Sequence, residues 1–504
     1  MAPTASHTPG PRQPVPGARA ALALLLIINL FNYIDRQVLS AVLPALQLDS
    51  SIFDPTDAYL QSKLGLLTSA FLVSYTLLSP VFGWFGGRSH RWFVVGIGVV
   101  LWSIASGSSG LATGFAMLLA TRCLVGVGEA AYGPVAPSML SDLFPIDHRG
   151  RVMAFFYLAI PVGSALGFVI GGQMEAHFGW RSAFYITYLG IPLGIVCFLM
   201  KVGAKAAPST KAISHSYGAV LRELRTIPSF VYCCLGMTAT TFMLGGVAAW
   251  APAYIFQREA RFEVTAGTFD TLRGLKTTSG ELLVPESVFA KLEPIRDTPA
   301  KPFTDFRTEL RERLGENDLR QYGDQVFRAA TAPGSITLGK ITFVFGAIVV
   351  VSGLGATLLG GYLGDRFREK GVKGAYFKVA GWTTLAAWPF FVLMLFVPFP
   401  YAWAPLFVAV FGLFLNTGPA NTVLANVTRS EIRATAFAIN ILVIHMLGDV
   451  ISPPLIGFVG DIANLHTAFL ITSFAIPIGG LLWVRGARHL DEDTIRVERT
   501  MTNG

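Results

Sequence analysis

The chain has 504 residues, of which 52% are hydrophobic and only 14% are charged. A soluble chain carries about 25% charged residues, so this composition excludes a soluble globular protein, a disordered chain and a secreted disulfide scaffold. The net charge of +8 would suit a nucleic-acid-binding protein, but the basic residues are placed in a way that argues otherwise, as described below.

Twelve apolar stretches are long enough to cross a bilayer, which takes about 20 residues of helix. We expect all of them to be helices, because an open strand cannot satisfy its backbone in lipid. The predicted spans are 20–46, 62–85, 92–112, 115–142, 152–175, 181–200, 229–256, 336–362, 376–397, 402–428, 434–460 and 466–485. The four cysteines lie inside these spans, where we interpret them as packing residues rather than disulfides.

Lysine and arginine are strongly biased to one side of these spans. Short loops and tails on one side carry 22 of them, whereas the short loops on the other side carry only Lys63 and Arg181. Because basic loops stay in the cytoplasm, both termini are predicted to be cytoplasmic. The basic balance is therefore a topology signal, and we expect no nucleic-acid partner. A bacterial inner membrane is the expected location.

The spans divide the chain into two halves and leave one surplus segment. We expect a disordered cytoplasmic tail (1–18), an N-terminal six-helix half (19–200), a cytoplasmic linker (201–228), a C-terminal six-helix half (229–486) and a cytoplasmic tail (487–504). Residues 257–335 form the surplus segment, an extracytoplasmic insert in which 303–328 has the spacing of an amphipathic helix. The insert is predicted to be either a solvated cap or a lid over the outer mouth.

Three short motifs recur in the two halves at similar positions. Gly83-Trp-Phe-Gly-Gly-Arg88 follows span 2 and Gly361-Tyr-Leu-Gly-Asp-Arg366 follows span 8. Gly-Pro pairs at 133–134 and 418–419, and matching starts of spans 5 and 11 at residues 151 and 433, complete the repeat. Two repeated six-helix halves are typical of a transporter that binds its substrate between the halves.

This pattern resembles the major facilitator superfamily over essentially the whole chain, apart from the tails and the insert. The second copy keeps the family's loop motif as Gly361-x-x-x-Asp365-Arg366, whereas in the first copy Gly87 stands where the aspartate belongs. The resemblance implies that an aspartate and arginine in a tight turn latch neighbouring helix ends. It implies cytoplasmic gate motifs at Gly83, Arg88, Asp142, Arg149, Arg151, Gly361, Asp365 and Arg366.

Three further segments resemble the spinster branch of this superfamily. They are Asn32-Tyr-Ile-Asp-Arg36, Arg122-Cys-Leu-Val-Gly-Val-Gly-Glu-Ala130 and His445-Met-Leu-Gly-Asp-Val-Ile-Ser-Pro453. The resemblance implies transport of lipid-like amphiphiles, of the lysophospholipid or sphingoid-phosphate type, coupled to protons in a bacterial member. We expect amphiphilic lipid substrates and membrane lipids as partners, no cofactor other than the coupling proton, and a monomer.

Independently of the family, few ionisable residues lie deep inside the spans. Each charged one costs about 2.5–3.5 kcal/mol to insert, so such residues face a cavity or each other. Arg122 and Glu129 are seven residues apart, which places them on one face of span 4 about 10 Å apart, with Gly126 between them. We expect each to find a partner on span 1, which carries Asp35 and Arg36.

These charges suggest a mechanism. The cluster is neutral with both acids ionised, so protonation of Glu129 or Asp35 leaves a positive site for an anionic head group. Arg36, Arg122 and His445 are the candidate head-group ligands, and Asn32, Tyr157 and Asn421 are candidate cavity-lining residues. A purely structural charge network between spans 1 and 4 is the alternative. His445 and Asp449, four residues apart, are equally compatible with a local helix-stabilising pair, and no metal site is expected.

Other functions fit less well. The chain has no P-loop, no dinucleotide-binding glycine motif and no Gly-x-Ser-x-Gly turn, so no enzyme activity is expected. Gly163, Gly167, Gly171 and Gly172 are predicted to form a face for close helix packing. A proton-coupled amphiphile transporter is the first hypothesis, a proton-coupled transporter of small organic anions the second, and a passive channel or sensor the third.

Overall fold

The computed structural model of the chain describes residues 14–54, 57–86, 89–202, 217–276 and 280–502. Within these residues, twelve helices are long and apolar enough to cross a membrane. Their ends lie within about three residues of the predicted ones, except that the eighth runs on to Glu369. The predicted all-α membrane fold with twelve spans is therefore confirmed.

The N-terminal half contains the first six spans. They are α1 (Ala18–Leu46), α2 (Leu60–Gly86), α3 (Arg91–Ser109), α4 and α5 (Phe115–Tyr132 and Val135–Leu143), α6 (Ile146–Phe178), and α7, η1 and α8 (Trp180–Tyr185, Ile186–Leu189 and Gly190–Leu199). The fourth span breaks at Gly133-Pro134 because proline lacks the N–H that would continue the hydrogen-bond ladder. The linker contributes α9 (Tyr217–Leu224), while residues 203–216 of it lie outside the described part of the chain.

The C-terminal half contains the other six spans. They are α10 (Pro228–Glu259), α14, η3 and α15 (Leu338–Val351, Ser352–Ala356 and Thr357–Glu369), α16 (Ala375–Phe396), α17 and α18 (Trp403–Phe414 and Thr417–Asn426), α19, η4 and α20 (Ser430–Ile444, His445–Asp449 and Ser452–Ile462), and α21 and α22 (Leu465–Thr472 and Ala475–Gly486). The segments η3 and η4 are π-helical turns, which often occur at functional sites.

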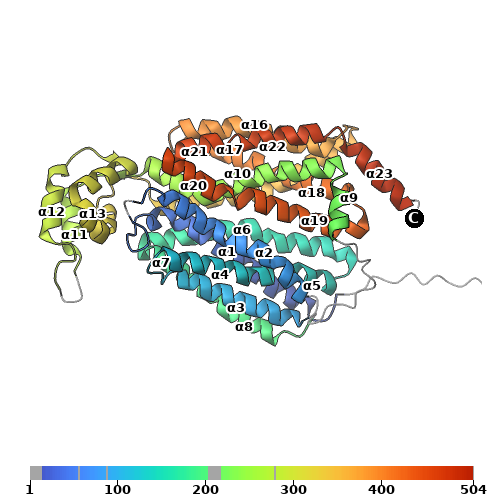
Figure 1. The fold of residues 1–504 in the computed structure, drawn as a ribbon, viewed down its shortest axis with the longest axis horizontal. Helices are drawn as coiled ribbons and strands as arrows, with labels where there is room; N and C mark the ends of the chain where they lie inside the picture. The colour runs from blue at the N-terminus through green and yellow to red at the C-terminus, as the bar shows by residue number, and fades with distance from the viewer. Residues whose placement is uncertain (1–13, 55–56, 87–88, 203–216, 277–279, 503–504) are drawn as a thin grey trace, which may run out of the picture.

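The two halves lie side by side as two layers of roughly parallel rods (Figure 1). The insert projects from one end of this bundle, which we call the insert end. The C-terminal helix α23 (Leu490–Thr502) lies at the opposite end, which we call the termini end. The side on which the predicted cytoplasmic loops fall is the termini end.

Glycines allow the closest approaches between helices, as their spacing predicted. A methyl group added at Gly163, Gly167 or Gly171 would overlap atoms of α1, and one added at Gly172 would overlap Thr342 of α14. In lipid, where apolar contact alone gives little drive for association, such close backbone packing is a main source of helix affinity. Helix α6 therefore packs on α1 within its own half and reaches across to α14.

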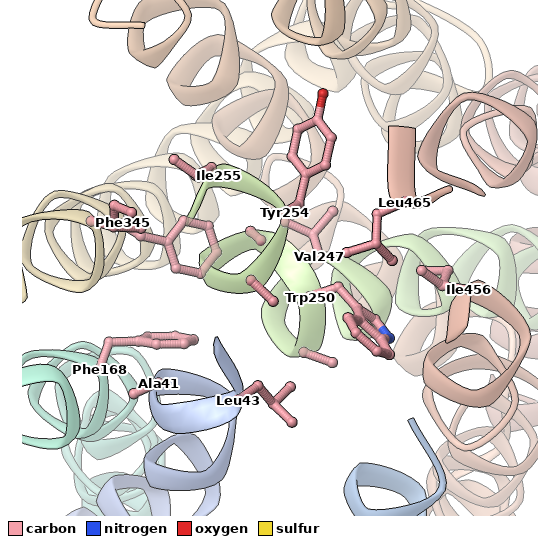
Figure 2. Close-up of a cluster of buried hydrophobic side chains, with 14 of the residues drawn as sticks. Ala41, Leu43, Phe168, Val247, Trp250, Tyr254, Ile255, Phe345, Ile456 and Leu465 are labelled. Carbon is pink, nitrogen blue, oxygen red and sulfur yellow. The ribbon is translucent and has the colours of Figure 1, made fainter. Parts of the chain in front are cut away.

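Toward the insert end, the halves share one buried apolar cluster (Figure 2). Phe168 of α6 meets Phe345 of α14 edge to face, with ring centroids 4.9 Å apart. Ser69 of α2 donates a hydrogen bond across the boundary to Val450 O of the C-terminal half. These contacts join the halves firmly at this end.

The insert is a small folded unit with its own core. It contains β1 (Arg261–Phe262), α11 (Ala266–Gly274), α12 (Glu286–Leu292), η2 (Glu293–Ile295), β2 (Lys301–Pro302) and α13 (Phe303–Ala329). The strands β1 and β2 pair antiparallel. The amphipathic helix predicted at 303–328 is present as α13, with its apolar side in the insert core and a kink at Gly315.

The described parts of both chain ends contact the helix bundle. Residues 1–13 lie outside the described part of the chain, but Val15 N already donates to Leu143 O and α1 begins at Ala18. Residues 490–502, within the predicted cytoplasmic tail, form the helix α23. Asp491 of α23 accepts from Gly374 N ahead of α16, and Asp493 accepts from Ser229 N in the first turn of α10.

Candidate functional site

Four charged side chains from α1 and α4 meet inside the N-terminal half. Arg36 donates from both Nε and Nη2 to Glu129 Oε2, at 2.8 and 2.7 Å. Arg122 Nη2 lies 3.8 Å from Asp35 Oδ1. The prediction that Arg122 and Glu129 each find a partner on span 1 is therefore confirmed.

A serine on α3 connects the second pair. Ser106 donates a hydrogen bond to Asp35 Oδ1 and accepts one from Arg122 Nη2 at 3.0 Å. Arg122 also lies over the ring of Phe184, 5.5 Å from its centroid. Three helices and one ring thus fix Asp35 and Arg122, which are both almost fully buried.

The position of the first pair depends on Gly126. A methyl group there would overlap Ser74 Oγ and Phe71 O of α2 and lie 2.9 Å from Tyr75 N. Because Gly126 has no side chain, α4 lies directly against α2, and Glu129, one turn further along, reaches Arg36 between the two helices. The glycine between the two charges is thus the point at which α4 contacts α2.

Aromatic rings surround the Arg36 guanidinium. Its carbon lies 4.9 Å from the ring centroid of Tyr33, 5.4 Å from that of Phe71 and 5.2 Å from that of Tyr75. Rings stabilise a guanidinium through their negative faces, most strongly where water is excluded. The Arg36 side chain is 15% exposed, whereas those of its three charged partners are at most 2% exposed. Arg36 is therefore the member of the cluster that a ligand can reach.

Both buried acids keep one oxygen without a partner among the described residues. These are Asp35 Oδ2 and Glu129 Oε1, and Arg122 Nε is likewise unpartnered. Buried polar atoms in proteins are nearly always hydrogen-bonded, so such exceptions point to strain, water or function. Each carboxylate has an oxygen that can take a proton without losing its existing partner first.

Comparisons with known proteins place this arrangement in a family. The Major Facilitator Superfamily model matches residues 25–272. Spinster homolog 1 of Bos taurus is 30% identical over 94% of this chain and 81% of its own length. The chain belongs to the spinster family. Sphingosine-1-phosphate transporter SPNS2 of Xenopus tropicalis is 26% identical over 95% of this chain and 83% of its own length.

A solved structure agrees with the fold. The crystal structure of a bacterial homologue of the human lysosomal transporter spinster superposes with a TM-score of 0.68. It is 18% identical, and the match covers 95% of this chain and 98% of that one. The spinster-like major facilitator fold inferred from the motifs is thus confirmed. The protein is a multi-pass membrane transporter rather than an enzyme.

The three predicted cavity residues of this spinster protein differ in their surroundings. Asn32 is buried beside the cluster, and its Nδ2 has no partner within the described chain. Tyr157 of α6 is 48% exposed. Asn421 of α18 is exposed, and its Nδ2 donates back to Thr417 O at 2.9 Å. The lining role assigned to them stays a prediction.

His445 belongs to a separate pair in the C-terminal half. Its Nδ1 lies 2.9 and 3.0 Å from the two carboxylate oxygens of Asp449, within the π-turn η4. Asp449 in turn packs against Gly245 of α10, where a methyl group would overlap its Cβ. The local pair that the spacing suggested is present. Among the described residues there is no group of three potential metal ligands.

The gate motif of the C-terminal half differs from the prediction in one respect. Asp365 and Arg366 lie in the last turns of α15 rather than in a tight turn. Helix α15 continues beyond the predicted end of the eighth span and ends at Glu369, just before Gly371, whose φ is 74°. Asp365 still links neighbouring helices, because it accepts from Tyr376 Oη of α16 at 2.7 Å. Arg366 donates to Tyr362 of its own helix.

The corresponding motif of the N-terminal half is described only in part. Arg88 lies outside the described residues, as does the side chain of Arg149. Gly83 faces Pro134, and Arg151 is exposed near the start of α6. In the C-terminal half, no described atom lies within 4 Å of the position that a side chain would occupy at Gly361. Asp142 pairs with Arg91 Nη1 at 2.6 Å and so joins α5 to α3.

Sequence reasoning missed several functional neighbours. Ser103, Ser106 and Ser109 recur every third residue in α3 and are all fully buried, a polar stripe that could have identified Ser106. The ring cage of Arg36 has a weaker signal, since Tyr33 lies on the same helix but Phe71 and Tyr75 lie on another. Nothing in the local sequence indicated that Arg91 would pair with Asp142.

Proposed function

We propose that this spinster protein is a proton-coupled secondary transporter that moves lipid-like amphiphiles with an anionic head group by alternating access. The observation that carries the proposal is the buried cluster of two acids and two arginines, in which each acid keeps one oxygen that has no partner in the described part of the chain. The formal charge of the cluster is zero when both acids are ionised. A single proton changes that charge to +1 in a site of low dielectric, where its effect on an anion is large.

Proton binding acts directly on the Arg36–Glu129 pair. A proton on Glu129 Oε1 leaves the geometry at Oε2 in place but removes the negative charge that holds Arg36. The guanidinium is then available for an anion while the ring cage keeps it in position. Asp35 supplies a second protonation site, coupled to the first through Arg122 and Ser106. Loss of the proton restores the internal pair and expels the anion.

The chemistry of Arg36 favours a phosphate or carboxylate head group. A guanidinium offers a planar set of donors that match these groups in a bidentate manner, and the aromatic rings around it add apolar surface for the adjoining chain. The relative SPNS2 is a sphingosine-1-phosphate transporter, which supports this substrate class. Lysophospholipids and sphingoid phosphates share this combination of one anionic head and one apolar tail.

Alternating access is supported by the repeat and by the packing at the insert end. In the present structure the halves join at the insert end, and the solved bacterial relative was crystallised in an inward-facing conformation. With basic loops in the cytoplasm, the insert end is extracytoplasmic and both termini are cytoplasmic. We propose a monomer in a bacterial inner membrane that uses no cofactor other than the proton.

Lysophospholipid flux into proteoliposomes, with and without an imposed pH gradient, tests the proposal. Wild type should show gradient-driven flux, and Glu129→Gln, which cannot ionise, should lose the response to the gradient. Asp491→Asn removes an acid of α23 that lies outside the cluster and should keep that response. Full gradient-driven flux in Glu129→Gln would refute the coupling role. Gradient-driven flux of a sugar acid in wild type, with no flux of lysophospholipid, would instead favour small organic anions.

A further inference from the structure

The insert belongs to the C-terminal half by chain connection, but it contacts the N-terminal half. Arg320 of α13 pairs with Asp54, and its carbonyl oxygen accepts from Ser50 Oγ. Eight residues further along α13, Arg328 Nη2 lies 3.7 Å from Glu175 Oε1 of α6. The second segment of α13 therefore carries two arginines that pair with two acids on the other half.

Apolar contact accompanies these ion pairs. Leu48, at the end of the first span, packs against the buried core of the insert. Next to it, Gln257 Nε2 donates to Gln47 Oε1 at 3.0 Å, again from one half to the other. At this end the N-terminal half thus contacts the insert and α10 through ion pairs, an amide hydrogen bond and the packing of Leu48, rather than through a single surface ion pair.

The loop that receives the insert is held rigidly by Asp49. Its carboxylate accepts from Ser51 N at 2.9 Å, from Trp180 Nε1 at 2.9 Å and from Arg181. Burial alone would raise the pKa of Asp49, but the hydrogen bonds from Ser51, Arg181 and Trp180 outweigh it and lower that pKa below its usual value. The loop therefore presents Ser50 and Asp54 in a fixed position.

The insert has a core and end-to-end hydrogen bonds of its own. Its two ends are hydrogen-bonded to each other, since Glu263 N donates to Ala330 O and Ala332 N donates to Arg261 O. Its core of phenylalanine, leucine and valine side chains forms a cluster of its own, which meets the main apolar cluster at Phe256 of α10. A unit that enters and leaves the bundle at one point can be removed with little strain on α10 and α14.

We infer that the insert is a latch that stabilises the conformation closed at the insert end. Opening that end separates the halves, so Arg320 and Arg328 leave Asp54 and Glu175, and Leu48 leaves the insert core. The latch rests on the proposed alternating access but not on the substrate or on proton coupling. Because its ion pairs are partly exposed, salt weakens it.

Spin labels at the insert end test the latch directly. Leu111 and Tyr401 lie on loops of the N-terminal and C-terminal halves, and their side chains are 54% and 73% exposed. Each is replaced by cysteine and labelled, in a protein whose four native cysteines have been replaced. The distance between the labels reports the ratio of open to closed insert ends. Replacing residues 263–330 by a short Gly-Ser linker should raise this ratio about tenfold, because it removes both ion pairs and the apolar contact together.

Charge reversal provides a test that leaves the insert in place. Arg320→Glu should raise the open-to-closed ratio about threefold, and adding Asp54→Arg should return it toward wild type. Arg273→Glu is the matched control, because Arg273 pairs with Glu286 inside the insert. An unchanged distance distribution in the excision variant, or equal effects of Arg320→Glu and Arg273→Glu, would overturn the latch. A substrate-dependent change of this distance in wild type would uphold alternating access whatever the variants show. Failure of the latch can therefore be distinguished from failure of the proposed alternating access.

Discussion

Asp461 of α20 caps the first turn of α2 across the boundary between the halves. Its carboxylate accepts from Gln61 N at 2.8 Å and from Ser62 N and Oγ at 2.7 and 2.6 Å. The first N–H groups of a helix have no partner within the helix, and a carboxylate there also interacts favourably with the helix dipole. Here the helix belongs to the N-terminal half and its cap to the C-terminal half.

The cap therefore stabilises only the conformation that is closed at the insert end. Loss of an N-cap costs about 1–2 kcal/mol. If the open conformation lacks the contact, Asp461→Ala raises the open-to-closed ratio about five- to thirtyfold, since 1–2 kcal/mol corresponds to such a factor. Asp461→Asn keeps one acceptor oxygen but loses the charge, so we expect a smaller change in the same direction.

The assay is the distance between spin labels at Leu111→Cys and Tyr401→Cys. Asp491→Ala provides the matched control, because Asp491 caps α16 through Gly374 N within one half. Because this cap lies within one half, it is present in both the open and the closed conformation. The control should therefore lower the melting temperature without changing the distance distribution. An unchanged distribution in Asp461→Ala, with a lower melting temperature as in the control, would refute the reasoning.

Three further predictions concern single contacts. Gly126→Ala should lower the free energy of unfolding by about 1–3 kcal/mol through overpacking against α2. Gly361→Ala, where the added methyl group meets open space, should be neutral or stabilising. A thiol-reactive dye that detects exposure of the buried cysteines on unfolding measures both variants. Asp49→Asn should cost about 1–3 kcal/mol at neutral pH. Because the pKa of Asp49 is lowered on folding, that difference should shrink as the pH falls below about 4, as melting curves from pH 3 to 7 would show. Tyr376→Phe should cost about 1 kcal/mol by removing the hydrogen bond to Asp365, measured as a lower melting temperature, and an unchanged value would show that this link does not stabilise the fold.

The sequence alone determined the twelve spans and the identity of the buried charges. Span positions follow from a local rule, since about 20 apolar residues in lipid must be helical and their ends coincide with charged loops. The seven-residue spacing of Arg122 and Glu129 likewise fixes one face of one helix, and the nearest charges outside it were those of span 1. The amphipathic spacing of residues 303–328 predicted α13 for the same reason.

Only the tertiary structure decided which faces of different helices meet. Ser106 joins Asp35 to Arg122, two rings of α2 complete the cage around Arg36, and Asp461 caps a helix that begins 400 residues earlier in the chain. The same holds for the insert, whose composition fitted a solvated cap or a lid, and whose contacts with the N-terminal half became visible only in the fold. Helical periodicity specifies how one helix presents its residues, but the rotation and depth of neighbouring helices result from packing over the whole bundle.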